Sequence, residues 1–117
     1  MSIVLDGTNG VTLPATTNVQ NAVICAWCNF DGTLSGTIAP RASYNVTSIT
    51  KTGTGQYTVN FTNAITDSNY AVMACGGVNS STAYPTLALP NNSSSAYVRC
   101  YSGAYYDQNY MSVMVVR

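Results

Sequence analysis

The chain has 117 residues, the length of a single domain, and Ser, Thr and Asn make up a third of it. Charged residues make up 7% of the chain and the formal net charge is zero, whereas a typical domain has about 25% charged residues. No cluster of Lys and Arg and no long apolar stretch is present, which argues against nucleic acid as a partner and against membrane insertion.

The composition favours an all-β fold. Glu is absent and Lys51 is the single lysine, whereas Thr, Val and Tyr, which favour strands, are abundant. A surface without net charge resists association weakly, so we expect a homo-oligomer. The first residues lack the basic and apolar segments of a signal peptide, so we expect folding in a cytosol that keeps thiols reduced.

In chain order, we expect an extended arm over residues 1–21 and one domain over residues 22–117. Runs rich in β-branched and aromatic residues, separated by clusters of Gly, Asp, Asn and Ser, predict the strands. These runs are Ala22–Phe30, Ser43–Thr50, Gln56–Thr62, Asn69–Gly76, Tyr84–Leu89, Ala96–Ser102 and Tyr110–Arg117. About seven or eight short strands at this spacing are typical of a β-sandwich or small barrel, and we expect a jelly-roll-like antiparallel sandwich.

Three of these strands carry further information. Ser43–Thr50 and Gln56–Thr62 are expected to form a hairpin, whose turn over Lys51–Gly55 leaves Lys51 solvated. Ile49 falls out of phase in the first strand, which predicts a β-bulge. The last strand, Tyr110–Arg117, is apolar on both faces, so we expect it at the centre of the fold or at a subunit contact.

Cys25-Ala26-Trp27-Cys28 has the spacing of a redox or metal motif. Within a strand, side chains three residues apart point to opposite faces, with Cα atoms about 10 Å apart. A disulfide requires roughly 4.4–6.8 Å, and Cys75 and Cys100 are isolated, with no His to complete a zinc site. We therefore expect four small buried hydrophobic residues, with no metal and no cofactor.

No catalytic constellation is evident. Without His or Glu, acid–base chemistry falls to Asp6, Asp31, Asp67 and Asp107. Each of them stands in a turn context, before Gly or in an Asp-x-Asn-Tyr segment, where a carboxylate bonds the nearby backbone. We therefore do not expect an enzyme.

Tyrosine is the residue type that suggests a binding surface. Six of the nine tyrosines follow residue 83, and Ser102–Asn109 is expected to be a loop that presents Tyr105 and Tyr106. The rigid ring and polar tip of Tyr suit stacking on sugars and anchoring of protein contacts. The alternative is that the tyrosines are strand formers that fill sheet faces, which is favoured for Tyr97 and Tyr101 and stays open for Tyr105 and Tyr106.

A linked series of motifs resembles the C-terminal domain of bacteriophage tail fibre and virion fibre proteins, notably those of marine and cyanobacterial phages. The motifs are Ala26–Thr33, Ile38–Thr50, Gly53–Thr62 and Asp67–Val72, preceded by a leader over Leu5–Pro14. The resemblance covers residues 5–75, with a small insertion at Ala39-Pro40 and with cysteines at positions 25 and 28 where the family usually has other residues. It implies a β-rich virion module, commonly trimeric, without catalytic or metal residues.

These observations lead us to expect a homotrimeric fibre or knob module that adheres to a host receptor, a surface glycan or protein. The candidate binding residues are Tyr84, Asn91, Asn92, Tyr105, Tyr106 and Asp107. The alternative is a head decoration protein, whose arm over Ser2–Val19 docks on the capsid lattice. In either case we expect synthesis in the cytoplasm of a host bacterium, contacts with other virion proteins of the tail or capsid, and a place on the virion surface.

Overall fold

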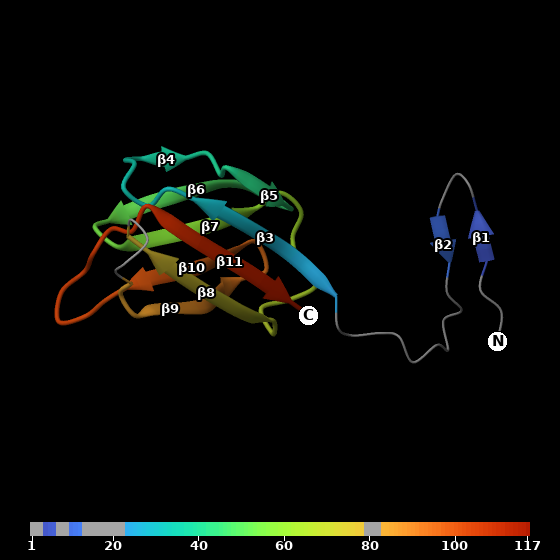
Figure 1. Cartoon of the computed structure of the whole chain (residues 1–117). Coiled ribbons are helices and arrows are strands. Elements are labelled where there is room, and N and C mark those ends of the chain that lie inside the picture. Colours follow the sequence, from blue (N-terminus) through green and yellow to red (C-terminus); the bar gives the residue numbers. More distant parts are fainter. Residues whose placement is uncertain (1–3, 7–9, 13–22, 79–82) are drawn as a thin grey trace.

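Figure 1 shows the computed structural model, which describes residues 4–6, 10–12, 23–78 and 83–117. The predicted all-β antiparallel sandwich is confirmed, because the described residues form strands in two antiparallel sheets that enclose one core. The first sheet contains, in spatial order, β4 (Thr37–Ile38), β6 (Val46–Gly53), β7 (Gln56–Phe61), β10 (Ser95–Cys100) and β9 (Thr86–Asn92). The second contains β5 (Ala42–Tyr44), β3 (Ile24–Phe30), β11 (Tyr110–Val116) and β8 (Ala71–Gly77).

Part of the expected arm is a hairpin rather than an extended segment. β1 (Val4–Asp6) and β2 (Gly10–Thr12) pair antiparallel and form a two-stranded sheet of their own. The rest of residues 1–21 lies outside the described residues, and the boundary at residue 22 stays a prediction.

The core follows from the alternation of each strand. On β7, Tyr57, Val59 and Phe61 are buried, as the sequence predicts, while the residues between them face outward. Its neighbour β10 and the strands β3 and β11 of the second sheet also bury alternate residues. The edge of one ring meets the face of another in two contacts, Phe30 with Tyr57 at a centroid distance of 5.2 Å and Phe61 with Tyr70 at 5.8 Å.

The predicted strand Ser43–Thr50 is wrong as a single element, because the chain changes sheets at Asn45. β5 pairs with β3 in the second sheet, whereas β6 pairs with β7 in the first. Asn45 adopts the left-handed conformation (φ 55°), which Asn tolerates better than most residues. Its amide nitrogen donates to the carbonyl oxygens of Cys25 and Asn63, both at 3.0 Å, and its Oδ1 accepts from Asn63 N at 2.7 Å.

The hairpin partly differs from expectation as well. The predicted bulge is confirmed, since the β6–β7 register shifts between Val46 and Ser48, and again between Lys51 and Gly53. However, β6 extends to Gly53, so Lys51 lies in the strand rather than in the turn, and its side chain is only 12% exposed. The expectation of a solvated lysine is therefore wrong.

The last strand lies at the centre of its sheet, which is one of the two places expected for it, the other being a subunit contact. β11 lies between β3 and β8 and directs Met111, Val113 and Val115 into the core. Its opposite face, which includes Tyr110 and Met114, is exposed. The core explains why one face of β11 is apolar. The opposite face is exposed and is available for contact with another molecule.

The four cysteines are free thiols, but they differ in burial. Cys28 and Cys100 are core residues, and burial raises the pKa of Cys28 to about 12, so its thiol stays protonated. Cys25 is half-buried beside a β-bulge, and Cys75 is exposed. The prediction that all four are buried is wrong for Cys75, because on β8 the alternate residues Val72 and Ala74 pack against the core instead.

Candidate ligand-binding site

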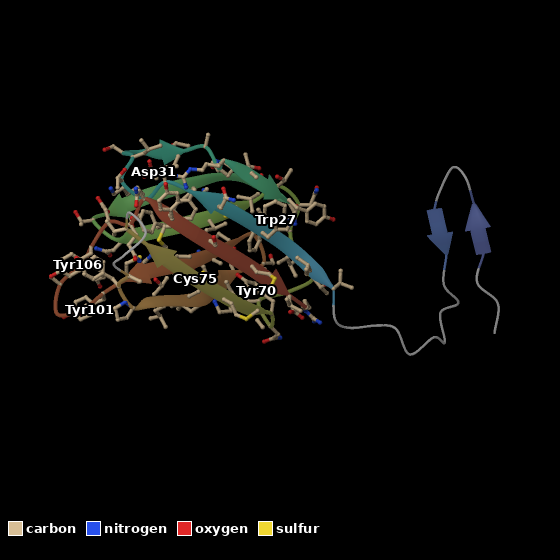
Figure 2. The ribbon with its side chains drawn as sticks, viewed as in Figure 1. Trp27, Asp31, Tyr70, Cys75, Tyr101 and Tyr106 are labelled. Carbon is tan, nitrogen blue, oxygen red and sulfur yellow. The ribbon has the colours of Figure 1, made fainter. Side chains whose placement is uncertain are left out.

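One end of the sandwich gathers tyrosines from two segments. The loop over residues 101–109 connects β10 to β11, and residues 83–85 lead into β9. The two segments are joined by a hydrogen bond from Tyr101 N to the Pro85 carbonyl oxygen at 3.1 Å. Figure 2 shows Tyr101 and Tyr106 together at this end, remote from Trp27 on β3.

The loop closes on itself as a small turn. Tyr101 and Tyr105 form an antiparallel bridge, and Ser102 N donates to the Ala104 carbonyl oxygen at 2.9 Å. Gly103, at the tip, has a φ of 75°, a conformation that favours glycine. Tyr106 N donates to the Cys100 carbonyl oxygen at 3.1 Å, which ties the loop back to the end of β10.

Four rings form what we call the tyrosine cluster: Tyr84, Tyr101, Tyr105 and Tyr106. Tyr84 and Tyr106 stack in parallel with centroids 4.1 Å apart, and Tyr101 meets Tyr105 edge to face at 5.1 Å. Tyr101, Tyr105 and Tyr106 are exposed, although each ring is held by a neighbour. A rigid, exposed aromatic surface can stack on a ligand at little cost in conformational entropy.

Asp107 anchors the loop to the first sheet. Its Oδ2 accepts from Lys51 Nζ at 2.7 Å, and its Oδ1 accepts from Gly55 N at 2.8 Å and lies 3.1 Å from the Tyr57 hydroxyl oxygen. Lys51 Nζ also donates to the Gly32 carbonyl oxygen at 3.0 Å. The single hydroxyl proton of Tyr57 is shared between this carbonyl oxygen, at 2.8 Å, and Asp107 Oδ1. We call this group, Gly32, Lys51, Gly55, Tyr57 and Asp107, the anchor cluster.

The charges of the anchor cluster support one another. Burial alone would raise the pKa of Asp107, but the hydrogen bonds from Lys51, Gly55 and Tyr57, with the Lys51 charge, hold this pKa below its ordinary value. Burial and the neighbouring Asp107 carboxylate raise the pKa of Tyr57, so its phenol remains a donor. Both carboxylate oxygens of Asp107 are thus engaged within the fold, which leaves this predicted binding residue as a support for the loop.

Gln108 anchors the other side of the loop and was not anticipated from the sequence. Its side chain is fully buried, with Oε1 accepting from Tyr84 N at 3.0 Å and Nε2 donating to Thr86 Oγ1 at 3.2 Å. A Cβ at Gly76 would lie 2.6 Å from Met111 Sδ and 2.7 Å from Gln108 Nε2, so any side chain there would displace one of these two buried groups. Asp107 and Gln108 together fix the tyrosine cluster from two directions.

A groove of about 650 Å³ lies beside the cluster. Its lining residues are Pro85, Thr86, Leu87, Arg99, Tyr101 and Tyr105. The walls are therefore aromatic and aliphatic, with the Arg99 guanidinium as the charged group. An apolar recess with a few polar groups is the usual form of a small-molecule site.

The structure brings together only part of the predicted binding set. Tyr84, Tyr105 and Tyr106 meet in the tyrosine cluster, but Asn91 and Asn92 lie at the far end of β9, about 20 Å from Thr86 at roughly 3.3 Å per residue. Asn91 Nδ2 donates to Ser95 Oγ at 2.8 Å, and Asn92 Oδ1 accepts from Ser94 N at 2.7 Å. These two asparagines hold the turn between β9 and β10.

A second exposed surface crosses the second sheet. Tyr44, Trp27, Met114 and Met73 are successive cross-strand neighbours on β5, β3, β11 and β8, and we call them the apolar row. All four are exposed, Trp27 by 39% and Met73 by 51%, and a hollow of about 420 Å³ lies along the row. The outer face of β6 and β7 in the first sheet is polar by contrast, with Thr47 bonded to Thr62 and Asn60 bonded to Thr50.

Comparison of the chain with protein-family models, curated proteins and solved structures finds no match. In the described part of the chain, no group of three or more Cys, Asp, Glu or His side chains is arranged to hold a metal ion. The same residues include no helix that is long and apolar enough to cross a membrane.

Replacement of Asp107 tests the anchor cluster. We expect Asp107→Ala to lower the free energy of unfolding by about 3 kcal/mol, because it leaves the enclosed Lys51 ammonium unpaired. Asp31→Ala breaks the longer pair with Arg41 at 3.7 Å, whose cation is 42% exposed, and two bonds from Thr33 in the same turn. It should cost less, about 1 kcal/mol, because its loss leaves no enclosed charge unpaired. Urea unfolding of both variants measures the difference.

The acid dependence of Asp107→Ala provides a second readout. The folded pKa of Asp107 is depressed, so its stabilisation is full above the unfolded pKa and is lost as pH falls. The difference between wild type and Asp107→Ala should therefore shrink below about pH 4. Equal losses for Asp107→Ala and Asp31→Ala at neutral pH would contradict this account.

Proposed function

We propose that the protein is a non-catalytic virion surface module, a homotrimer that attaches to a host-surface glycan or protein through the tyrosine cluster. The observation that carries the proposal is the cluster itself, three tyrosines on a doubly anchored loop and Tyr84 on the adjoining segment, beside a groove. The phage context rests on the sequence resemblance of residues 5–75 to virion fibre domains.

Attachment suits the groove better than catalysis does. Asp31, Asp67 and Asp107 are paired with Arg41, Arg117 and Lys51, and none of these carboxylates lines the groove. The groups that face a ligand are tyrosine rings, leucine and a guanidinium, which stack and donate hydrogen bonds. These groups support recognition of a ligand rather than its chemical conversion.

The apolar row supports the trimer, with a second copy of this chain as its occupant. The row contains no charged residue, and Trp and Met are residue types enriched in protein interfaces. The carboxylates of Asp31, Asp67 and Asp107 are neutralised within each chain, so two copies meet without strong repulsion from them. Three binding ends on one particle offset weak single contacts by avidity.

One observation favours the alternative of a head decoration protein. β1 and β2 form a separate two-stranded sheet within the arm, and an arm with its own structure can dock on a capsid lattice. In that case the tyrosine cluster contributes to stability, and attachment depends on residues 2–19.

Replacement of two tyrosines tests the adhesion proposal. Binding of the purified protein to bacterial cells of a host panel should fall by at least about tenfold in Tyr105→Ala/Tyr106→Ala, because each lost stacking ring contributes roughly 1 kcal/mol. Leu34→Ala removes an exposed apolar side chain that lies outside both the groove and the apolar row, and it is the control. The oligomeric state of each variant is measured, and only variants with the same state as wild type are compared. The number of binding ends per particle, and hence the avidity, is then the same.

Undecorated phage capsids complete the test. Retention on capsids but not on cells, lost when residues 2–19 are deleted, would replace the adhesion proposal with the decoration alternative. Cell binding that is unaffected by Tyr105→Ala/Tyr106→Ala would remove the tyrosine cluster from the site.

A charge placed in the apolar row tests the subunit contact. We expect wild type to be trimeric by light scattering and Met73→Glu to be monomeric, because burial of an unpaired carboxylate in an apolar contact is costly. Thr47→Glu, which adds the same charge to the outer face of the first sheet, should stay trimeric. A monomeric wild type, or a trimeric Met73→Glu, would show that the row is not the contact.

A further inference from the structure

We propose that the groove beside the tyrosine cluster binds an acidic sugar, and that Arg99 receives its carboxylate. The inference rests on the proposed role of this end of the sandwich as the attachment site, and it names the class of ligand. Three observations support it: the other cations have carboxylate partners, the Arg99 guanidinium is fixed by contacts that leave one edge free, and the groove has an aromatic wall.

Arg99 is the unpaired cation of the region whose side chains the structure describes. Lys51, Arg41 and Arg117 each have a carboxylate partner, at 2.7, 3.7 and 2.7 Å. Asp31, Asp67 and Asp107 are the partners in these pairs, and within the region whose side chains are described none of them forms an ion pair with Arg99. In a chain with so few charges, an unpaired guanidinium in a groove requires an explanation.

The guanidinium is nevertheless fixed in place. Its Nη1 donates to the carbonyl oxygens of Tyr57 and Val98 at 2.8 and 2.9 Å, and its Cζ lies 4.7 Å from the centre of the Tyr97 ring. These contacts occupy Nη1 and one face of the guanidinium, while Nε and Nη2 have no acceptor among the described residues. Nε and Nη2 form the edge that binds a carboxylate with two parallel hydrogen bonds.

The groove supplies the complementary surface for a sugar ring. Tyr101 and Tyr105 line it on one side, and Leu87 lies directly opposite Arg99 across the β9–β10 pair. The apolar face of a pyranose can stack on a tyrosine ring while a carboxylate at its rim reaches the guanidinium. The volume of about 650 Å³ falls within the range of small-molecule sites.

The experiment uses a panel of bacterial surface polysaccharides that contain uronic acids, each immobilised in its native form and after chemical reduction of its carboxyl groups. Reduction removes the charge and keeps the sugar backbone. Wild type should bind at least one native polysaccharide, and its affinity for the reduced form should fall at least about tenfold, the effect of losing a charge-assisted hydrogen bond.

Position 87 allows a test that leaves the bonds of Arg99 in place. Leu87 is 60% exposed and is the cross-strand partner of Arg99. We expect Leu87→Glu to abolish binding to the native polysaccharide, because a carboxylate there competes for the guanidinium and repels the ligand. Leu87→Gln has the same shape without the charge and should retain binding. Arg99→Gln should lose it, while Arg117→Gln should not, because Arg117 follows the end of β11 that is remote from the groove.

The outcomes separate the inference from the proposed function. If wild type binds native and reduced polysaccharides equally, and Leu87→Glu matches Leu87→Gln, the acidic sugar is overturned. Loss of the same binding in Tyr105→Ala/Tyr106→Ala would then leave the tyrosine cluster as an attachment site for neutral ligands. If wild type binds no polysaccharide, the acidic sugar is also overturned, and retention on cells decides whether the site recognises a protein instead.

Discussion

The carboxylate of Asp107 is the interaction on which the binding end of the molecule depends. It joins the loop before β11 to β6 through Lys51, to the β6–β7 turn through Gly55 and to the core through Tyr57. A partly buried carboxylate is tolerated here because its oxygens accept hydrogen bonds from an ammonium, a backbone amide and a hydroxyl. The loop that carries Tyr105 and Tyr106 thereby gains a rigid base although its own backbone forms only a small turn.

Close packing beneath the loop complements the anchor cluster. Gly55 has a φ of 64°, and a Cβ there would lie 2.6 Å from the Tyr106 carbonyl oxygen, so the turn and the loop touch backbone to backbone. Gln108 fixes the segment that carries Tyr84 from the opposite side. The stack of Tyr84 on Tyr106 therefore joins two segments that are each held independently, as a preorganised site requires.

The sequence predicts the fold well where a pattern is local. Tyr57, Val59 and Phe61 alternate with polar residues, so their strand and its buried face are evident from periodicity alone. The change of sheets at Asn45 is not evident, because the segments on both sides favour strands and the break depends on partners at Cys25 and Asn63. Periodicity therefore predicts one strand where two short strands belong to different sheets.

The site was predictable only in its exposed part. A loop with adjacent tyrosines identifies Tyr105 and Tyr106, but the partner of Asp107 is 56 residues away, and a lone lysine near glycines is typical of a solvated turn. Arg99 was missed because it alternates with buried residues on β10, and its unpaired charge becomes evident only when the partners of the other cations are known. Such facts depend on tertiary contacts rather than on local propensity.

Amide hydrogen exchange of the intact protein tests most directly whether the anchor cluster holds the binding loop. The amides of Gly55 and Tyr106 donate to Asp107 and Cys100, respectively, within and beside that cluster. At neutral pH both should have protection factors similar to those of β10, and on acidification through the Asp107 pKa they should lose protection before β3 does. Exchange of both amides at unprotected rates at neutral pH, with the strands still protected, would contradict the account.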